Sequence, residues 1–430
     1  MRDYLKSLVG GGGVKVLALA AGFALQLLCV RVMGEEAYGH YIYAMTWLSG
    51  LLIVVVSAVD SSAIRFISQY DRPDMARLKS GYLAWAMKRM DRNLAIVMIG
   101  GILMGIALAR MNANFSMGVF LVLMTSIFAS SRGALFTASL QAMKRPAMAF
   151  FPRSVLLPIL AMAGLVLFYG LGLPIGAIEM ACIYVVASYL VYVLIAKMHG
   201  WANMESLEKD DVFTEAEQWR RFSNQMFLLG VVGLVLSRFD LLLLGAYVPA
   251  KEVGVYNVCA RLSEICALAL VVSNIWVGPM ISRHFHQQEH AQLQHLLTYS
   301  GRLVTALTAV AVLGVVSLGP VVLSWYGPNF QDGYEALIIL SVGQLLNALF
   351  GPVGFILTMT GHSDAALRIY GIAMIVMTSA SILLIPSYGI NGAALASAIG
   401  VVTWNLLMCI YVAKRLKLDP TVLGLLRGRL

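Results

Sequence analysis

Charged residues are scarce in this sequence of 430 residues. Asp, Glu, Lys and Arg together make up 12% of the chain, whereas a typical soluble domain carries about 25%. Hydrophobic residues make up 60%, which is more than a water-soluble protein needs for its core. The composition therefore predicts a protein that folds in a lipid bilayer.

The motifs of several enzyme classes are missing. The glycine run 10–13 is followed by Val14 and Lys15 and lacks the G-x-x-x-x-G-K-[ST] pattern of a phosphate-binding loop, so we expect no ATP hydrolysis. None of the five cysteines belongs to a C-x-x-C pair. A lipoprotein signal is also excluded, because Leu28 stands before Cys29 at a position where such a signal needs a small residue. We expect the cysteines to be packing residues, the N-terminal segment to be retained, and the protein to hold no metal or cofactor.

Long apolar stretches recur along the whole chain. A membrane-spanning helix needs about 20 mostly apolar residues, and twelve stretches come near this condition. The sequence therefore predicts an all-α polytopic membrane protein with about twelve transmembrane helices. The predicted helices cover residues 13–33, 38–64, 94–110, 115–141, 151–170, 174–196, 222–244, 253–279, 302–326, 334–360, 367–386 and 390–413.

Basic residues are distributed unevenly between the loops. If the N-terminus is cytoplasmic, 24 of the 31 Lys and Arg residues fall in cytoplasmic tails and loops, and only Arg110 and Lys251 fall in the opposite loops. Cytoplasmic loops are the ones that carry an excess of positive charge. The distribution predicts that both termini are cytoplasmic, and it accounts for the net charge of +9 without nucleic-acid binding.

The two halves of the chain share three short patterns at offsets of 215, 216 and 217 residues. A parallel repeat of this kind predicts two six-helix lobes related by a pseudo-two-fold axis along the membrane normal, with the substrate site between them. We predict an N-terminal lobe at 1–196, a polar cytoplasmic linker at 197–221 and a C-terminal lobe at 222–430. The patterns are Gly39-x-Tyr41 and Gly254-x-Tyr256, Gly176-Ala177 and Gly392-Ala393, and Ala196-Lys197 and Ala413-Lys414.

Three segments resemble a known transporter family. They are similar to the first hairpin, the end of the second span, and the second-half signature of Wzx-type polysaccharide flippases. This family belongs to the superfamily that also holds the multidrug and toxin exporters and the lipid II flippase. The segments are Val32-Met33-Gly34-Glu35-Glu36-Ala37-Tyr38-Gly39-x-Tyr41, Asp60-x-x-Ala63-x-Arg65-Phe66-Ile67-Ser68, and Arg238-Phe239-Asp240-x-x-x-Leu244-Gly245 followed by Val253-Gly254-x-Tyr256.

The resemblance implies both a substrate and a mechanism. The substrate would be an oligosaccharide on undecaprenyl pyrophosphate, moved from the cytoplasmic to the periplasmic leaflet of the bacterial inner membrane. Alternating access driven by an H⁺ or Na⁺ gradient would carry it out, for the synthesis of O-antigen, lipopolysaccharide or exopolysaccharide. Partners would be the lipid-linked oligosaccharide, membrane lipids and the polysaccharide polymerase machinery.

Charged residues inside the apolar stretches are the candidate functional residues. Such a residue costs about 2.5–3.5 kcal/mol at the centre of a spanning helix, so it usually faces a cavity or a partner. A guanidinium group offers a planar fork of donors that suits a pyrophosphate. For this role we predict Arg31, Arg132, Arg238 and Arg261.

Carboxylates in the same stretches are the candidates for ion coupling. A carboxylate in a partly dry cavity can take up a proton or Na⁺, and for this role we predict Asp60, Asp240 and Glu264. An alternative reading is structural, since intramembrane charges commonly pair with each other. Asp240 with Arg261, and Arg238 with Glu264, are predicted to lie at similar depths, and Arg261 can also pair with Glu264 along its own helix.

A multidrug exporter and a membrane-embedded enzyme are the alternatives to the flippase. A cation-coupled multidrug exporter of the same superfamily is the alternative, although its cavity would be more acidic than these arginines suggest. A membrane-embedded transferase or polymerase would need a catalytic loop, and no loop of the required size is found, so we expect no enzyme. His286 and His290 have the i, i+4 spacing of zinc ligands, but without further ligands nearby we expect a solvated helix.

Overall fold

The computed structural model describes residues 2–112, 114–143, 146–199 and 215–422, and every regular element in them is helical. The chain divides into two compact units, residues 1–231 and 232–430. Most of the predicted linker, residues 200–214, lies outside the described residues, so the predicted lobe boundaries stay predictions. The prediction of an all-α polytopic membrane protein is confirmed.

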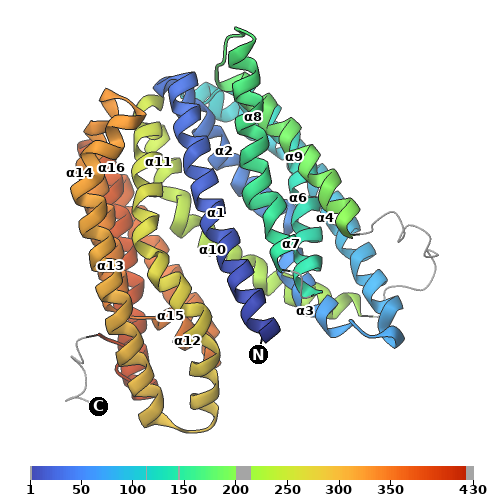
Figure 1. Ribbon diagram of the computed structural model, residues 1–430, viewed down its shortest axis with the longest axis vertical. Helices are drawn as coiled ribbons and strands as arrows, with labels where there is room; N and C mark the ends of the chain where they lie inside the picture. Colours follow the sequence, from blue (N-terminus) through green and yellow to red (C-terminus); the bar gives the residue numbers. More distant parts are fainter. Residues whose placement is uncertain (1, 113, 144–145, 200–214, 423–430) are drawn as a thin grey trace. The chain divides into compact units, whose positions relative to one another are not determined.

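The first unit begins with long helices that are interrupted at specific residues (Figure 1). The break between α2 and α3 falls at Ser57 and Ala58, which both have left-handed backbone angles. The bend between α5 and α6 is 41°. The helices of this unit are α1 (Arg2–Met33), α2 (Glu35–Val56), α3 (Val59–Gln69), η1 (Pro73–Met75), α4 (Ala76–Met111), α5 (Met117–Met124), α6 (Ser126–Ala142), α7 (Pro146–Phe151), η2 (Pro152–Leu156), α8 (Leu157–Gly170) and α9 (Ala177–His199).

The boundary between the units falls inside α10 (Ala216–Tyr247), so this helix contributes to both. The second unit has a bend of 44° between α14 and α15, beside Gly351 and Pro352. Gly389 has a non-helical backbone inside α16. The remaining helices are α11 (Ala250–Glu264), η4 (Ile265–Ala267), α12 (Leu268–His286), α13 (His290–Tyr326), η5 (Pro328–Gly333), α14 (Tyr334–Leu349), α15 (Val353–Met359), α16 (Ser363–Tyr411) and η6 (Val412–Leu416).

The described helices match the predicted spans in order. Eight helices are long and apolar enough to cross a membrane, or ten if each bent pair is one span. One of the eight, Ser363–Leu416, contains the two predicted spans on either side of Gly389. The first predicted span corresponds to the shorter apolar helix Leu17–Met33. The chain is therefore a multi-pass membrane protein.

Large apolar side chains are exposed on the outer faces of these helices. Ile99 and Leu103 on α4 are 67% and 63% exposed, and Val310 and Leu313 on α13 are 68% and 67% exposed. Contiguous apolar surface of this kind is rare on soluble monomers. These faces therefore fit contact with lipid chains.

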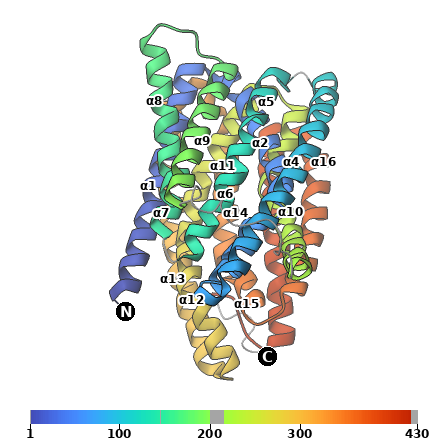
Figure 2. The same cartoon turned by 90° about the vertical axis from the view of Figure 1, so that its right-hand side faces the viewer.

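Each unit packs around its own core. In the first unit α6 lies along α9, as both views show (Figures 1 and 2), and Phe136, Val191 and Ile195 fill the contact. A second, aromatic core joins α3, α4 and the start of α10 through Phe66, Tyr82 and the fully buried Trp219. In the second unit α14 packs on α13 and α16.

Candidate functional site

Arg132 on α6 is held by a carboxylate of α4. Its Nη2 contacts Oδ1 of Asp91, and the guanidinium also lies 5.6 Å from the centre of the Phe128 ring. The Arg132 side chain is only 12% exposed, whereas that of Asp91 is 54% exposed. The ion pair therefore balances the charge of the mostly buried Arg132 with a half-exposed carboxylate, and it leaves the guanidinium over an aromatic ring.

Arg31 and Asp60 occupy the ends of their helices. Arg31 is exposed in the last turn of α1. Asp60 lies in the first turn of α3, directly after the left-handed residues Ser57 and Ala58, and its Oδ1 accepts a hydrogen bond of 2.7 Å from the backbone N–H of Ser61. A carboxylate in the first helical turn is favoured by the helix dipole. The helix dipole therefore explains why a charged residue is tolerated at position 60.

The structure places a further arginine in an apolar span of the first unit. Arg153 belongs to η2, a π-helical turn inside the span Met148–Gly170. Arg153 lies near the start of the predicted span 151–170, but the sequence alone predicted no role for it. The sequence does mark this position, because residues 146–152 and 154–170 on either side carry no charge. Arg153 is therefore an isolated charge in an apolar stretch.

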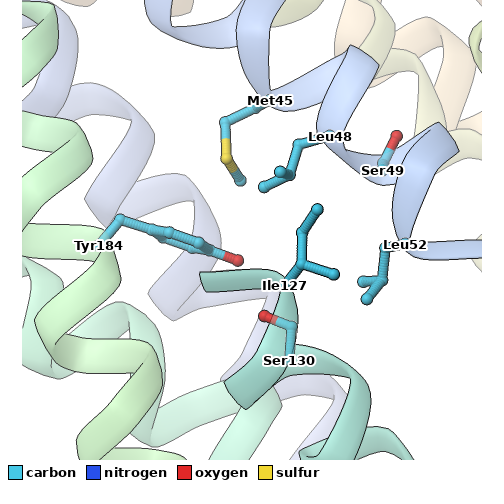
Figure 3. Close-up of a pocket in the computed structure, with 7 residues that line it drawn as sticks. All are labelled: Met45, Leu48, Ser49, Leu52, Ile127, Ser130 and Tyr184. Atoms are coloured by element: carbon cyan, nitrogen blue, oxygen red, sulfur yellow. The ribbon is translucent and has the colours of Figure 1, made fainter. Parts of the chain in front are cut away.

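A recess in the first unit lies between α2, α6 and α9 (Figure 3). Figure 3 shows Tyr184 reaching from α9 toward Ile127 and Ser130 on α6. The hydroxyl groups of Ser49, Ser130 and Tyr184 are the polar groups of an otherwise apolar lining. Ligand pockets commonly combine an apolar wall with a few such polar groups.

In the second unit one carboxylate forms ion pairs with two arginines. Oε2 of Glu264 lies 3.0 Å from Nη1 of Arg261, three residues earlier on α11, and Oε1 lies 3.8 Å from Nη2 of Arg238 on α10. The side chains of Arg238, Arg261 and Glu264 are 24%, 46% and 46% exposed. The cluster carries one net positive charge, so it can still attract an anion.

Asp240 is the buried carboxylate of the second unit, with 6% exposure. Oδ2 accepts hydrogen bonds from the hydroxyl groups of Tyr256 at 2.5 Å and Ser397 at 3.0 Å, and Oδ1 accepts one from the backbone N–H of Leu241 at 2.7 Å. Within the described residues Asp240 forms no ion pair with Arg261. The predicted alternative of an Asp240–Arg261 pair is therefore wrong, because neutral donors from α11 and α16 surround Asp240 instead.

The described histidines at the end of α12 and the start of α13 do not form a metal-binding group. Nδ1 of His284 lies 2.6 Å from Oε2 of Glu289, and the ring of His290 packs edge-on against Phe285. Among the residues that the structure describes, no group of three or more His, Cys, Asp or Glu side chains is placed to hold a metal ion.

Two curated proteins of Haloferax volcanii are similar in sequence to half of this chain. The first, "Probable low-salt glycan biosynthesis flippase Agl15", is 23% identical over 219 residues, which cover 50% of this chain and 46% of that protein. The second, "Probable flippase AglR", is 25% identical over 207 residues, which cover 47% and 43%. The alignments thus span about half the length of the relatives. No family model matches the sequence.

Solved transporter structures share the fold over nearly the whole chain. An inward-facing multidrug resistance MATE family transporter of the MOP superfamily superposes with a TM-score of 0.74 at 12% identity, covering 93% of this chain and 94% of the other. The lipid II flippase MurJ in an inward closed conformation gives a TM-score of 0.71 at 13% identity, covering 94% and 87%. The protein therefore has the all-helical, two-lobed transporter fold of the MATE family and the lipid II flippase, and half of its sequence is similar to proteins named as flippases.

Proposed function

We propose that this protein flips an undecaprenyl-pyrophosphate-linked oligosaccharide from the cytoplasmic to the periplasmic leaflet of a bacterial inner membrane. The observation that carries the proposal is the set of arginines inside apolar helices of a transporter fold. Arg132 is mostly buried, and Arg238 and Arg261 outnumber their shared carboxylate. Guanidinium groups suit the bidentate recognition of phosphate oxygens. The similarity of half the chain to named flippases agrees with this substrate class.

The carboxylates supply a basis for ion coupling. Asp240 is buried and is held by neutral donors, so it can accept a proton or a cation without first breaking an ion pair. Glu264 differs, because it is the shared counter-ion of Arg238 and Arg261. Asp60, with one local hydrogen bond from Ser61, is the corresponding candidate of the first unit. Transport by alternating access would use these groups and no chemical step, so the protein would be a transporter and not an enzyme.

A cation-coupled multidrug exporter is the second candidate, because a MATE transporter shares the fold with a TM-score of 0.74. The arginines argue against it, since a cationic drug would be repelled by the net positive charge of the Arg238, Arg261 and Glu264 cluster. An exporter would instead depend on the acidic residues alone.

Deletion of the gene separates the two candidates. A flippase deletion should leave undecaprenyl-pyrophosphate-linked oligosaccharide in the cytoplasmic leaflet and remove the surface polysaccharide. Wild-type protein should restore the polysaccharide, and the double variant Arg238→Gln, Arg261→Gln should not. Arg110→Gln, which removes an exposed charge at the last turn of α4, is the matched control and should restore it fully. Unchanged surface glycan together with increased drug sensitivity would instead identify an exporter.

A further inference from the structure

Arg153 lies on an unusual helical turn. The turn η2, Pro152–Leu156, is a π-helix between α7 and α8, inside an apolar span. A π turn carries one more residue than an α turn and is frequent at functional sites. Arg153 is the only charged residue of the described span Met148–Gly170.

The guanidinium of Arg153 differs from those of the other intramembrane arginines in its partners. Arg132, Arg238 and Arg261 each contact a carboxylate. Among the described residues, no hydrogen bond or ion pair forms at the side chain of Arg153, although the residue is partly buried. An ionisable group inside an apolar span is costly and almost always faces a partner or a cavity. A ligand can therefore supply the hydrogen bonds that the guanidinium does not receive from the described residues.

The surroundings of Arg153 suit an anion. Its Cδ lies 4.0 Å from the position that a Cβ would take on Gly133 of α6, so its stem runs along a residue without a side chain. The ionisable groups that act on it electrostatically are Tyr184 and Asp60. Tyr184 also lines the recess with Ser49 and Ser130 (Figure 3). Tyr184 thus connects Arg153 to a recess with an apolar wall, and the carboxylate of Asp60, in the first turn of α3, is the negative charge that acts on the guanidinium.

We propose that Arg153 is a phosphate-binding residue of the first unit and holds the pyrophosphate of a lipid-linked substrate. This inference rests on the function proposed above and adds a residue to it. The phosphate of a membrane phospholipid presents the same chemistry. The pyrophosphate is the better ligand because it offers more charge and more oxygens to the guanidinium fork.

Binding by the purified full-length protein in detergent tests the assignment. The probes are undecaprenyl pyrophosphate and phosphatidylglycerol, each titrated and followed by native mass spectrometry. Arg153→Gln should weaken the binding of undecaprenyl pyrophosphate by roughly tenfold or more, as expected for the loss of hydrogen bonds to a charged group. Arg153→Met should have the same effect. It is expected to fold, since it replaces an unpaired charge in an apolar span with an apolar side chain of similar length. Arg110→Gln, the matched control, should bind as the wild type does.

The outcomes separate the inference from the proposed function. If wild-type protein binds undecaprenyl pyrophosphate and both Arg153 variants bind it equally well, the assignment of Arg153 is overturned and the flippase proposal stands. If the variants lose phosphatidylglycerol and keep undecaprenyl pyrophosphate, Arg153 holds a structural lipid and the assignment is again overturned. If wild-type protein binds no undecaprenyl pyrophosphate, both proposals fail.

Discussion

Tyr256 on α11 donates a hydrogen bond of 2.5 Å to Asp240 on α10, and both side chains are buried. Ser397 on α16 donates a second one, at 3.0 Å, to the same carboxylate oxygen. Three helices of the second unit thus meet at one charge. Because a buried carboxylate that loses a donor pays a desolvation penalty, the stability of the unit depends on the donors that α11 and α16 supply to Asp240.

Tyr256→Phe removes one donor to Asp240 and leaves the aromatic packing in place. We expect the free energy of unfolding to fall by about 1–3 kcal/mol, the usual cost of a lost hydrogen bond to a buried charged group. Thermal unfolding in detergent measures the change. Tyr299→Phe is the control, because Tyr299 is 67% exposed, and it should leave stability unaltered. Equal melting temperatures for the two variants would show that Asp240 does not need the Tyr256 hydroxyl.

Glu264→Gln removes the carboxylate that Arg238 and Arg261 share. Two guanidinium groups then repel each other without a counter-ion, so we expect a loss of about 1–2 kcal/mol, below the 3–5 kcal/mol of a fully buried pair because the cluster is partly exposed. Arg261→Gln should cost less, about 0–1 kcal/mol, since Glu264 keeps its contact with Arg238.

The control for the Glu264 variant is Glu217→Gln. Glu217 pairs with Arg220 three residues later, but both side chains are more than 60% exposed, and exposed pairs contribute little. Chemical denaturation of the purified variants gives the comparison. If Glu264→Gln costs no more than Glu217→Gln, the cluster is not a structural unit.

Gly351→Ala should be strongly destabilising. Gly351 has φ +73°, and a Cβ there would lie 2.5 Å from the carbonyl oxygen of Pro420. The left-handed conformation alone costs about 1–2 kcal/mol for a residue with a side chain, and the clash adds to it. Gly230→Ala is the matched substitution inside α10, where nothing lies within 4 Å, and it should stabilise by roughly 0.5–1 kcal/mol. Opposite shifts in melting temperature are therefore expected, and shifts of the same sign would contradict the bend at Gly351.

Tyr70 should give the protein a pH-dependent stability at alkaline pH. Burial raises the pKa of Tyr70 to about 12, and the hydrogen bond that it donates to Glu215 acts in the same direction. Tyrosine in an unfolded chain has a pKa of about 10. The folded state thus holds the proton more tightly, and its stabilising contribution is complete below about pH 10 and is lost as the pH rises to about 12.

The matched variant for this pH effect is Tyr70→Phe. It keeps the ring in the aromatic core and removes the hydroxyl, which also accepts a hydrogen bond of 3.0 Å from Nε1 of Trp219. We expect the variant to be less stable at neutral pH and to lose less stability between about pH 10 and 12. Parallel pH profiles for the wild type and the variant would exclude Tyr70 as the titrating group.

The helices themselves could be predicted well because their signal is local. A run of about 20 apolar residues is sufficient to define a spanning helix. The predicted span 94–110 lies within α4, and the predicted span 174–196 includes all of α9 except its last three residues. The breaks were harder, since the left-handed residues Ser57 and Ala58 carry no glycine or proline signal. Gly389 lies in the predicted loop between the spans 367–386 and 390–413, and in the structure two helical segments meet at a kink at this residue, where the backbone is non-helical.

The candidate charges could be found from the sequence, and so could some of their partners, because the predicted pairs of Glu264 with Arg238 and with Arg261 both form. Other partners could not be predicted. The sequence marks Arg132 as a charge in an apolar stretch, yet its partner Asp91 lies 41 residues earlier, where no local pattern points to it. Asp240 and Arg261 looked like a pair by depth along their helices, whereas rotation about the helix axes directs Asp240 toward Tyr256 and Ser397. The depth of a residue along its helix follows from counting residues in the sequence. The direction in which its side chain points depends on how the helices pack.

The sequence was sufficient to predict that this protein is a helical membrane protein and which residues bring charge into the apolar spans. Those properties follow from composition and from local hydrophobic runs. The packing of the helices was needed to show that Asp91 is the partner of Arg132 and that Ser397 and Tyr256 bind Asp240. Such features depend on contacts between residues far apart in the chain, and the packing energies that select them are not written in any single segment.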